Sequence, residues 1–258
     1  MPHASKLSKH HFAIFIAVVL ALLATQAQQP SSTLAADTSG WTSLFQGTSL
    51  DGWDGRADVW KVEDGAITGE VAAGPSSVTD TTYIFWKGGK PSDFDFKADV
   101  KTTGAFVNTG LVYRGYVVSP PAARAASPPS ANGAYKLGGP QLDFDAADRY
   151  CGQYFEIATG RGLLARRGQI VEVRAGAKPA LVGSLGDDKT MSSYVKPGDW
   201  NQLRVIAHGN TIVHMINGRV VAVLIDEDTD HLRSDGLLAF QLEGAGKVQF
   251  RNIWLKTD

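Results

Sequence analysis

Residues 203–225 read LRVIAHGNTIVHMINGRVVAVLI, and this stretch decides the fold class. Three runs rich in β-branched residues are separated by the dipeptides Gly209-Asn210 and Asn217-Gly218. Two-residue loops of this composition tolerate positive φ angles and are the strongest short-range signal for a β-hairpin. The stretch therefore predicts a three-stranded antiparallel meander over residues 202–226.

The rest of the chain continues the pattern of short strands cut by turn residues. Asp64-Gly65 lies between VWKV and AITG and predicts another hairpin. No segment beyond residue 40 has an apolar period of 3.6, so few helices are expected. Residues 118–133 hold four prolines, cannot form a central strand, and predict either a mobile loop or a lid over a site. We therefore expect an all-β domain over residues 41–258, built as a two-sheet antiparallel jelly-roll sandwich.

The N-terminal residues predict export. Lys6 and Lys9 precede an unbroken apolar run from Phe12 to Ala24. As a helix this run rises only ~20 Å, which is too short for a bilayer core of ~30 Å. A basic head, a short apolar middle and small residues beyond it predict a signal peptide over 1–27, cleaved after Ala27. A flexible spacer over 28–40 would follow. The expected location is periplasmic or secreted, with no stable membrane anchor after cleavage; the alternative is an uncleaved anchor.

Charge and cysteine content narrow the classes of partner. Residues 1–27 contain two Lys and no acidic residue, so the rest of the chain has 23 basic and 26 acidic residues, a net charge of −3. A near-neutral domain gives no support to a nucleic acid or an anionic membrane as partner. Cys151 is the single cysteine, so no intrachain disulfide can form and stability must come from the core.

Alternation along three predicted strands separates an apolar side from a polar one. In 108–114, 141–145 and 238–243 the apolar sides hold Leu111, Tyr113, Leu142, Phe144, Leu238, Phe240 and Leu242. The opposite sides hold Asn108, Arg114, Gln141, Asp143, Asp145, Gln241 and Glu243. Planar amide, carboxylate and guanidinium groups can bond two neighbouring sugar hydroxyls at once. If the strands are neighbours in one sheet, they predict a sugar-binding face; the alternative is an ordinary solvated face.

His214 has two interpretations. Across the two tight turns it would pair with Val205 and Val221, which are both apolar. A histidine on such a face is more often a hydrogen-bonded core residue than a catalyst, and both roles stay open here.

The carboxylates Asp143, Asp145 and Asp148 form a D-x-D-x-x-D pattern. Their oxygens could bind a divalent cation such as calcium, although the spacing lacks the glycine and distal glutamate of a calcium loop. No cluster of His and Cys predicts zinc, so the sequence establishes no metal or other cofactor and leaves a divalent cation such as calcium open.

Eight segments of the chain, taken together in their order and spacing, resemble segments of one known domain family. They are GWTSLFQGTSLDGW (40–53), VWKVEDGAITGE (59–70), NTGLVYR (108–114), GGPQLDFD (138–145), YCGQYFE (150–156), GRGLLARRG (160–168), WNQLRVIAHGNTIVHMINGRVV (200–221) and FQLEGAGKVQFRNIWLK (240–256). Together they resemble the 3-keto-disaccharide hydrolase domain over about residues 40–257. The resemblance implies a concanavalin A-like fold with a sugar site on its concave sheet. It also implies cleavage of glycosides oxidised at C3, by removal of the C2 proton, elimination of the C1 substituent and later hydration.

The resemblance also assigns expected roles to the polar residues. Arg114 would stabilise the enolate or clamp the sugar, Asp143 and Glu156 would share the base and acid roles, and His214 is a further catalytic candidate. The residues expected to position hydroxyls are Asn108, Gln141, Asp145, Tyr154, Arg167, Gln241 and Glu243. The partner would be a small carbohydrate.

The chain departs from the family pattern at two positions. Glu243 stands where the family often has histidine, and Cys151 where many members have threonine. The first departure keeps a second hypothesis open: a non-catalytic, lectin-like domain that binds carbohydrate. A structural or protein-interaction sandwich, with a flat face and no pocket, is the third.

Overall fold

The computed structural model of the chain describes residues 39–72, 81–118 and 136–257. The predicted signal peptide, nearly all of the spacer and residues 119–133 of the proline-rich segment lie outside these ranges. Within them, no helix is both long and apolar enough to span a bilayer.

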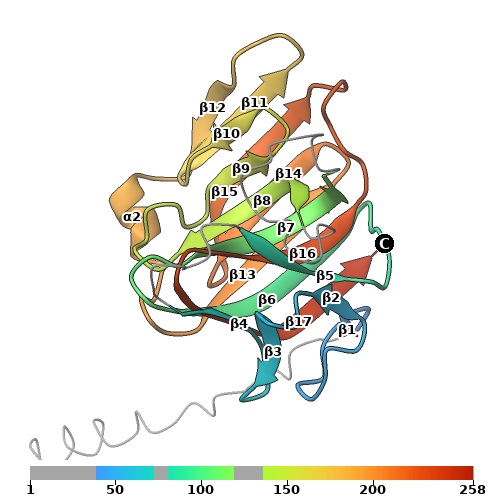
Figure 1. Cartoon of the computed structure of the whole chain (residues 1–258). Helices are drawn as coiled ribbons and strands as arrows, with labels where there is room; N and C mark the ends of the chain where they lie inside the picture. Colours follow the sequence, from blue (N-terminus) through green and yellow to red (C-terminus); the bar gives the residue numbers. More distant parts are fainter. Residues whose placement is uncertain (1–38, 73–80, 119–135, 258) are drawn as a thin grey trace, which may run out of the picture. The chain divides into compact units, whose positions relative to one another are not determined.

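Two sheets contain all the strands of the described ranges (Figure 1). The larger sheet has ten strands: β1 (Thr42–Ser43), β3 (Trp60–Glu63), β4 (Ala66–Val71), β6 (Phe94–Thr103), β11 (Gln169–Arg174), β12 (Ala180–Ser184), β13 (Asn201–His208), β14 (Thr211–Ile216), β15 (Arg219–Glu227) and β17 (Gly246–Thr257). The smaller sheet has seven: β2 (Trp53–Gly55), β5 (Thr82–Trp86), β7 (Asn108–Val117), β8 (Leu137–Asp145), β9 (Tyr154–Ile157), β10 (Gly162–Ala165) and β16 (Leu237–Glu243).

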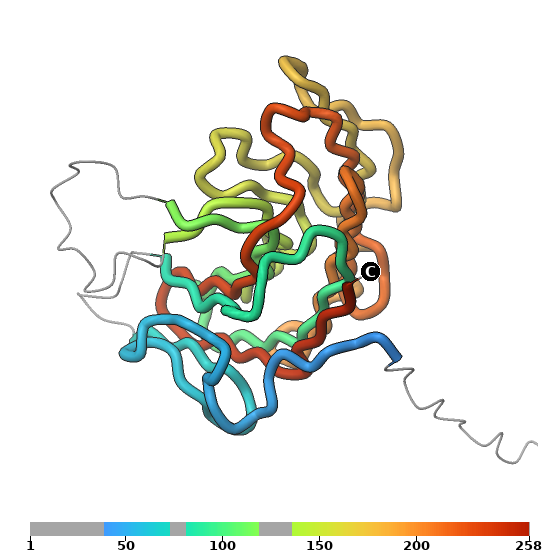
Figure 2. The backbone as a smooth tube through the Cα atoms, turned by 90° about the vertical axis from the view of Figure 1, so that its right-hand side faces the viewer, coloured from blue at the N-terminus to red at the C-terminus, as the bar shows by residue number. Residues whose placement is uncertain are grey.

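The strand order shows how distant segments become neighbours. The larger sheet runs β12-β11-β15-β14-β13-β6-β17-β4-β3, with β1 paired to β17, and the smaller runs β10-β9-β8-β7-β16-β5-β2. Every pair is antiparallel except β11 with β15, which is parallel. The prediction of an all-β, two-sheet antiparallel sandwich is therefore confirmed, with the parallel β11–β15 pair as its one exception among the described strands. Figure 2 shows the same backbone from the side.

The tight turns join the antiparallel strands that the sequence predicted. β13, β14 and β15 form the expected meander, and Asp64-Gly65 joins β3 to β4. Asp64 and Asn217 have positive φ angles of 52° and 49°, which Asp and Asn tolerate better than most residues. A single short helix, α2 (Asp188–Ser192), lies in the described ranges, and Asp187 caps it by accepting a hydrogen bond from the backbone of Thr190 at 2.7 Å.

The core lies between the two sheets and is made by their alternating apolar sides. Along β6 and β13 buried residues alternate with half-buried ones, as a sheet with one covered face requires. The rings of Phe240 on β16 and Phe250 on β17 stack with centroids 3.9 Å apart and join the two sheets. The smaller sheet differs, because β8 is buried along its whole length. The polar side chains of β8 are therefore buried as well, which those of an ordinary solvated face would not be.

Candidate active site

The predicted polar face forms on the smaller sheet. β8, β7 and β16 are neighbours, and Gly110 pairs with Asp143 on one side and with Gln241 on the other. The side chains of this face line an open hollow of about 570 Å³, within the usual range of small-molecule sites. Five predicted residues line it: Asn108, Gln141, Asp143, Gln241 and Glu243.

A glycine leaves room at the floor of this hollow. A Cβ atom on Gly110 would lie 2.5 Å from Nε2 of Gln141 and 2.3 Å from the carbonyl oxygen of Leu142. Because Gly110 has no side chain, the Gln141 amide passes over it and donates a hydrogen bond to Oε1 of Gln241. The two amides thus make a polar platform between the carboxylates at either side.

Asp143 is the most perturbed acid in the hollow. Its side chain is 5 % exposed, and Oδ2 accepts a hydrogen bond from Nε2 of Gln153 at 2.7 Å. Burial raises the pKa of Asp143 to about 7; the Gln153 bond opposes this rise, while the charges of Asp145 and Glu243 add to it. A carboxyl group with a pKa near neutrality can accept a proton from carbon and give it up again at physiological pH.

On the side of the platform away from Asp143, Glu243 and Asn108 carry hydrogen-bond acceptors and Tyr83 offers a neutral donor. Nδ2 of Asn108 donates to Oε2 of Glu243 at 3.1 Å, and Oδ1 of Asn108 is buried with no partner among the described residues. Tyr83 lies beside Gln241 on β5. Burial, together with the charge of Glu243, raises the pKa of Tyr83, so its hydroxyl stays protonated and can donate.

Sequence reasoning missed several residues of the hollow. Tyr83 lies among three consecutive buried residues of β5, in the run TYIFW, whose sequence has no polar–apolar alternation that could have assigned it to one face. Gln153 lies in the connection between β8 and β9, where no strand period applies. The other missed lining residues are Thr81, Tyr150, Phe155, Ile157, Leu163 and Arg166.

The prediction that Arg114 shares this face is wrong. The β7–β8 and β7–β16 ladders both shift register around this residue, and Arg114 has a φ of 45°. A bulge of this kind reverses the direction of the side chain. The buried guanidinium instead donates to the carbonyl oxygens of Ser92 (3.0 Å) and Gly209 (2.8 Å) and pairs with Asp93 at 3.3 Å.

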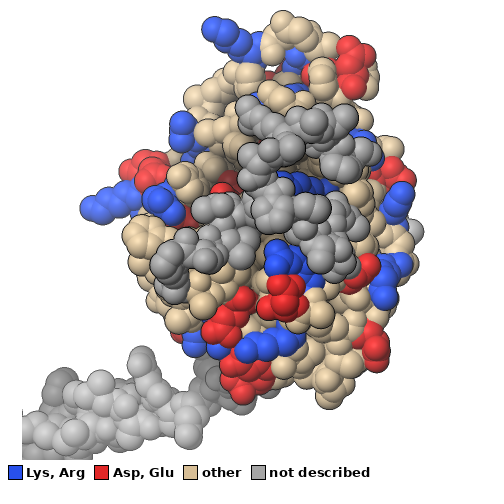
Figure 3. Space-filling model, viewed as in Figure 1, with Lys and Arg blue, Asp and Glu red and all other residues tan. Residues whose placement is uncertain are grey.

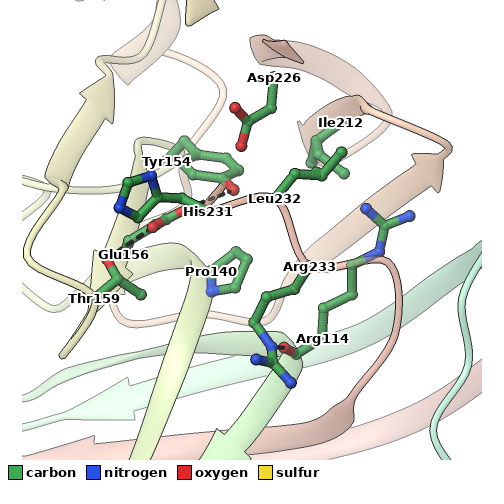
Figure 4. A pocket seen from close by; sticks show the side chains of 10 residues that line it. All are labelled: Arg114, Pro140, Tyr154, Glu156, Thr159, Ile212, Asp226, His231, Leu232 and Arg233. Carbon is green, nitrogen blue, oxygen red and sulfur yellow. Dashed lines mark hydrogen bonds between the residues drawn. The ribbon is translucent and has the colours of Figure 1, made fainter. Parts of the chain in front are cut away.

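Glu156 and Tyr154 also lie away from the hollow, on the other face of β9. Figure 4 shows them beside Asp226, with Arg114 and Arg233 further along the same small cavity. Arg161 binds the carboxylates of Glu156 and Asp226 and completes a buried ionic cluster. The cavity has about 10 Å³ of space, which is room for about one water molecule and not for a sugar. Asp143 and Glu156 therefore cannot act on one substrate from this arrangement.

His214 lies in the core between the sheets. It pairs with Val205 as predicted, but a register shift next to it replaces Val221 by Ala222 as the other neighbour. Its Nε2 lies 2.7 Å from the Tyr113 hydroxyl and its Nδ1 3.3 Å from the carbonyl oxygen of Gly152. A carbonyl only accepts, so the proton is assigned to Nδ1 and the tyrosine donates to Nε2.

Burial lowers the pKa of His214 to about 3, so the ring is neutral at physiological pH. Gly152 precedes Gln153, and its N–H donates to the carbonyl oxygen of Asp143 at 2.8 Å. In this structure His214 therefore supports the segment that contacts Asp143, and it does not line the hollow.

The remaining two predicted residues, Asp145 and Arg167, bind groups of the loop after β8. Asp145 accepts hydrogen bonds from the backbone of Arg149 (2.7 Å) and Tyr150 (2.8 Å) and pairs with the Arg149 side chain at 2.9 Å. Arg167 binds Asp148 and Asp188, which ties this loop to α2. The carboxylates of Asp145 and Asp148, which the sequence offered as cation ligands, are thus bonded to protein donors. The described residues hold no group of three or more His, Cys, Asp or Glu placed for a metal ion.

Charges of both signs lie on the face of the molecule drawn in Figure 3. On the face drawn in Figure 3, Lys and Arg alternate with Asp and Glu among the coloured residues. On this face the distribution matches the near-neutral composition.

Solved structures share the architecture. A candidate glycosyl hydrolase from Parabacteroides distasonis ATCC 8503 is 20 % identical over 86 % of this chain and 95 % of its own, with a TM-score of 0.51. A second structure so described from the same organism is 20 % identical over 84 % and 99 %, with a TM-score of 0.50. A carbohydrate-binding module, CBM66 from Bacillus subtilis, is 13 % identical over 80 % and 96 %, with a TM-score of 0.47. The first two likenesses show the fold.

Sequence comparison shows the family. No curated protein is significantly similar to the chain. A family model described as the 3-keto-alpha-glucoside-1,2-lyase-like domain matches residues 40–256, nearly the whole sandwich. The chain therefore belongs to the 3-keto-alpha-glucoside-1,2-lyase-like domain family.

Proposed function

We propose that the chain cleaves α-glucosides already oxidised at C3, with Asp143 as the base that removes the C2 proton. The observation that carries this proposal is the position of Asp143: a buried carboxylate with a pKa of about 7 in the wall of a sugar-sized hollow. Membership of a family named for 3-keto-α-glucoside 1,2-lyase chemistry supports the same substrate class.

The reaction balances without any cofactor. The ketone at C3 acidifies the C2 proton, which passes to Asp143 while the electron pair of the C–H bond forms the enolate. When the C3 carbonyl re-forms, a C1–C2 double bond appears and the bond from C1 to the leaving oxygen breaks. That oxygen takes a proton and departs as an alcohol. Water then adds its hydroxyl to C1 and its proton to C2, which gives the free 3-keto sugar.

Other groups of the hollow suit the remaining roles. The amides of Gln141 and Gln241 and the neutral Tyr83 hydroxyl are donors available to the enolate oxygen at C3. Glu243 replaces Glu156 as the second carboxylate of the hollow and lies on the far side of the platform from Asp143, where it can accept a bond from a hydroxyl of the reacting ring. The leaving oxygen can take the proton that Asp143 has removed from C2. Asn108 holds Glu243 in place by donating to its Oε2 at 3.1 Å.

The test is release of free sugar from 3-keto-trehalose or 3-keto-sucrose. Wild type should release it, and Asp143→Asn should lower kcat by about 10²-fold or more, because a general base contributes ~10²–10⁴-fold. Asp99→Asn is the matched control, because Asp99 bonds Asn252 (2.6 Å) and lies near Arg251 on the larger sheet. No release by wild type, with saturable binding of the unoxidised disaccharide, would establish the lectin-like alternative instead.

We also propose that the protein is exported. The basic and apolar composition of residues 1–27 supports this, and a 3-keto disaccharide would then be cleaved outside the cytoplasm. N-terminal sequencing of the protein recovered from the periplasm or medium should begin at Gln28. A protein retained in the cytoplasm with Met1 intact would refute export.

A further inference from the structure

One wall of the hollow is apolar. It consists of Phe155 and Ile157 on β9 and Leu163 on β10, which are half-buried and line the hollow together. Register places this wall next to the platform, because Phe155 pairs with Gln141 on one side and with Leu163 on the other. The row of side chains across the sheet thus changes from polar to apolar at the boundary between β8 and β9.

The wall is close to the proposed base. Asp143 and Gln141 are alternate residues of β8 and point to the same side, and Phe155 is the cross-strand neighbour of Gln141. Neighbouring strands lie ~5 Å apart. A sugar ring that presents C2 to Asp143 therefore holds its C1 substituent within reach of this wall.

The wall cannot bond hydroxyl groups. Ile157 and Leu163 have no polar atoms, and Phe155 offers only a ring face. A second sugar packed against these three side chains would find bonding partners only in Tyr150 and Arg166, elsewhere in the lining, and each hydroxyl left without a partner opposes binding. An apolar group placed there removes its own surface and that of the wall from water.

We propose that this wall is the subsite for the leaving group and selects 3-keto-α-glucosides whose aglycone is apolar, such as an alkyl, alicyclic or phenolic alcohol. The inference rests on the proposed function and deepens it. The polar platform binds the oxidised glucose ring, and the wall of Phe155, Ile157 and Leu163 binds what leaves from C1.

The test compares two substrates that share the reacting ring. One is the 3-keto derivative of cyclohexyl α-glucoside and the other is 3-keto-trehalose. Cyclohexanol has the size of a sugar ring but is intrinsically no better a leaving group, so a preference for it reports on binding at the wall. We expect kcat/KM for the cyclohexyl compound to be higher by about 10-fold or more, the effect of burying much of one apolar ring.

Two variants test whether the wall is responsible. Ile157→Thr keeps a β-branched residue in the strand, and Leu163→Gln keeps a similar volume. Each should lower kcat/KM for the cyclohexyl compound several-fold without lowering that for 3-keto-trehalose, because the new hydroxyl or amide gives a second sugar a bonding partner at the wall. Leu181→Gln is the matched control, because Leu181 is 63 % exposed on β12, outside the hollow.

The outcomes separate the two proposals. Cleavage of both substrates by wild type at equal kcat/KM overturns the aglycone subsite and leaves the proposed function intact. Cleavage of neither overturns the proposed function itself. Loss of activity on both substrates in both wall variants, with melting temperatures unchanged, overturns the aglycone subsite, because the wall would then hold the reacting ring.

Discussion

Replacing Asp143 by asparagine should stabilise the folded protein, and the size of the gain should depend on pH. The folded state holds the carboxyl proton up to about pH 7, whereas an unfolded aspartate releases it near its ordinary pKa of 3.8. The folded state therefore binds more protons between these values, and wild type loses stability as pH rises from about 4 to 7. Asparagine is neutral at every pH, so the variant does not lose this stability as the pH rises.

The magnitude follows from the pKa difference. About three pKa units at ~1.4 kcal/mol each give roughly 4 kcal/mol of stability gained by Asp143→Asn at about pH 8. Below about pH 4 the carboxyl is protonated in both states, so the two proteins should have the same free energy of unfolding. For a domain of this size the gain at high pH corresponds to a melting temperature higher by ~10 °C. The asparagine oxygen can still accept the Gln153 hydrogen bond.

The assay is urea unfolding of wild type and variant at several pH values, monitored by tryptophan fluorescence. The difference in unfolding free energy should rise between about pH 4 and pH 7 and then level off. Asp99→Asn, which removes a carboxylate from the larger sheet, should shift stability by less than ~1 kcal/mol at every pH. A destabilised Asp143→Asn protein, or a difference that does not change with pH, would refute the claim that burial holds this carboxyl near a pKa of 7.

Two further predictions concern the neighbours of the site. Gln153→Met removes the bond that lowers the pKa of Asp143, so the acid limb of the kcat/KM–pH profile should move to higher pH; an unmoved limb would contradict this role for Gln153. Arg161→Met leaves the buried carboxylates of Glu156 and Asp226 without their cation and should destabilise the fold by ~3–5 kcal/mol in urea unfolding. Unchanged stability of that variant would show that water already solvates the cluster.

Much of the fold and part of the site follow from the sequence because both depend on local rules. Tight turns such as Asn217-Gly218 fix which strands pair, and alternation then fixes which side chains share a face. This reasoning places Asn108, Gln141, Asp143 and Gln241 on one polar side, where the structure has them.

The positions of the other site residues were decided by the tertiary structure, because strand alternation does not predict them. The bulge at Arg114 interrupts the alternation and turns its guanidinium out of the predicted face. Glu156 belongs to a buried ionic cluster away from the hollow. Its partners there, Arg161 and Asp226, lie outside β9 and could not be paired with it from the sequence. Tyr83 meets Gln241 only because β5 and β16 pair across a long stretch of chain.

The property on which the proposed chemistry depends also belongs to the tertiary structure. The sequence supplied an aspartate at 143 with a polar neighbourhood. Its pKa of about 7 arises because the folded chain withdraws most of the residue from water and leaves only a small part of it exposed at the hollow, and burial of that kind is the sum of many distant contacts.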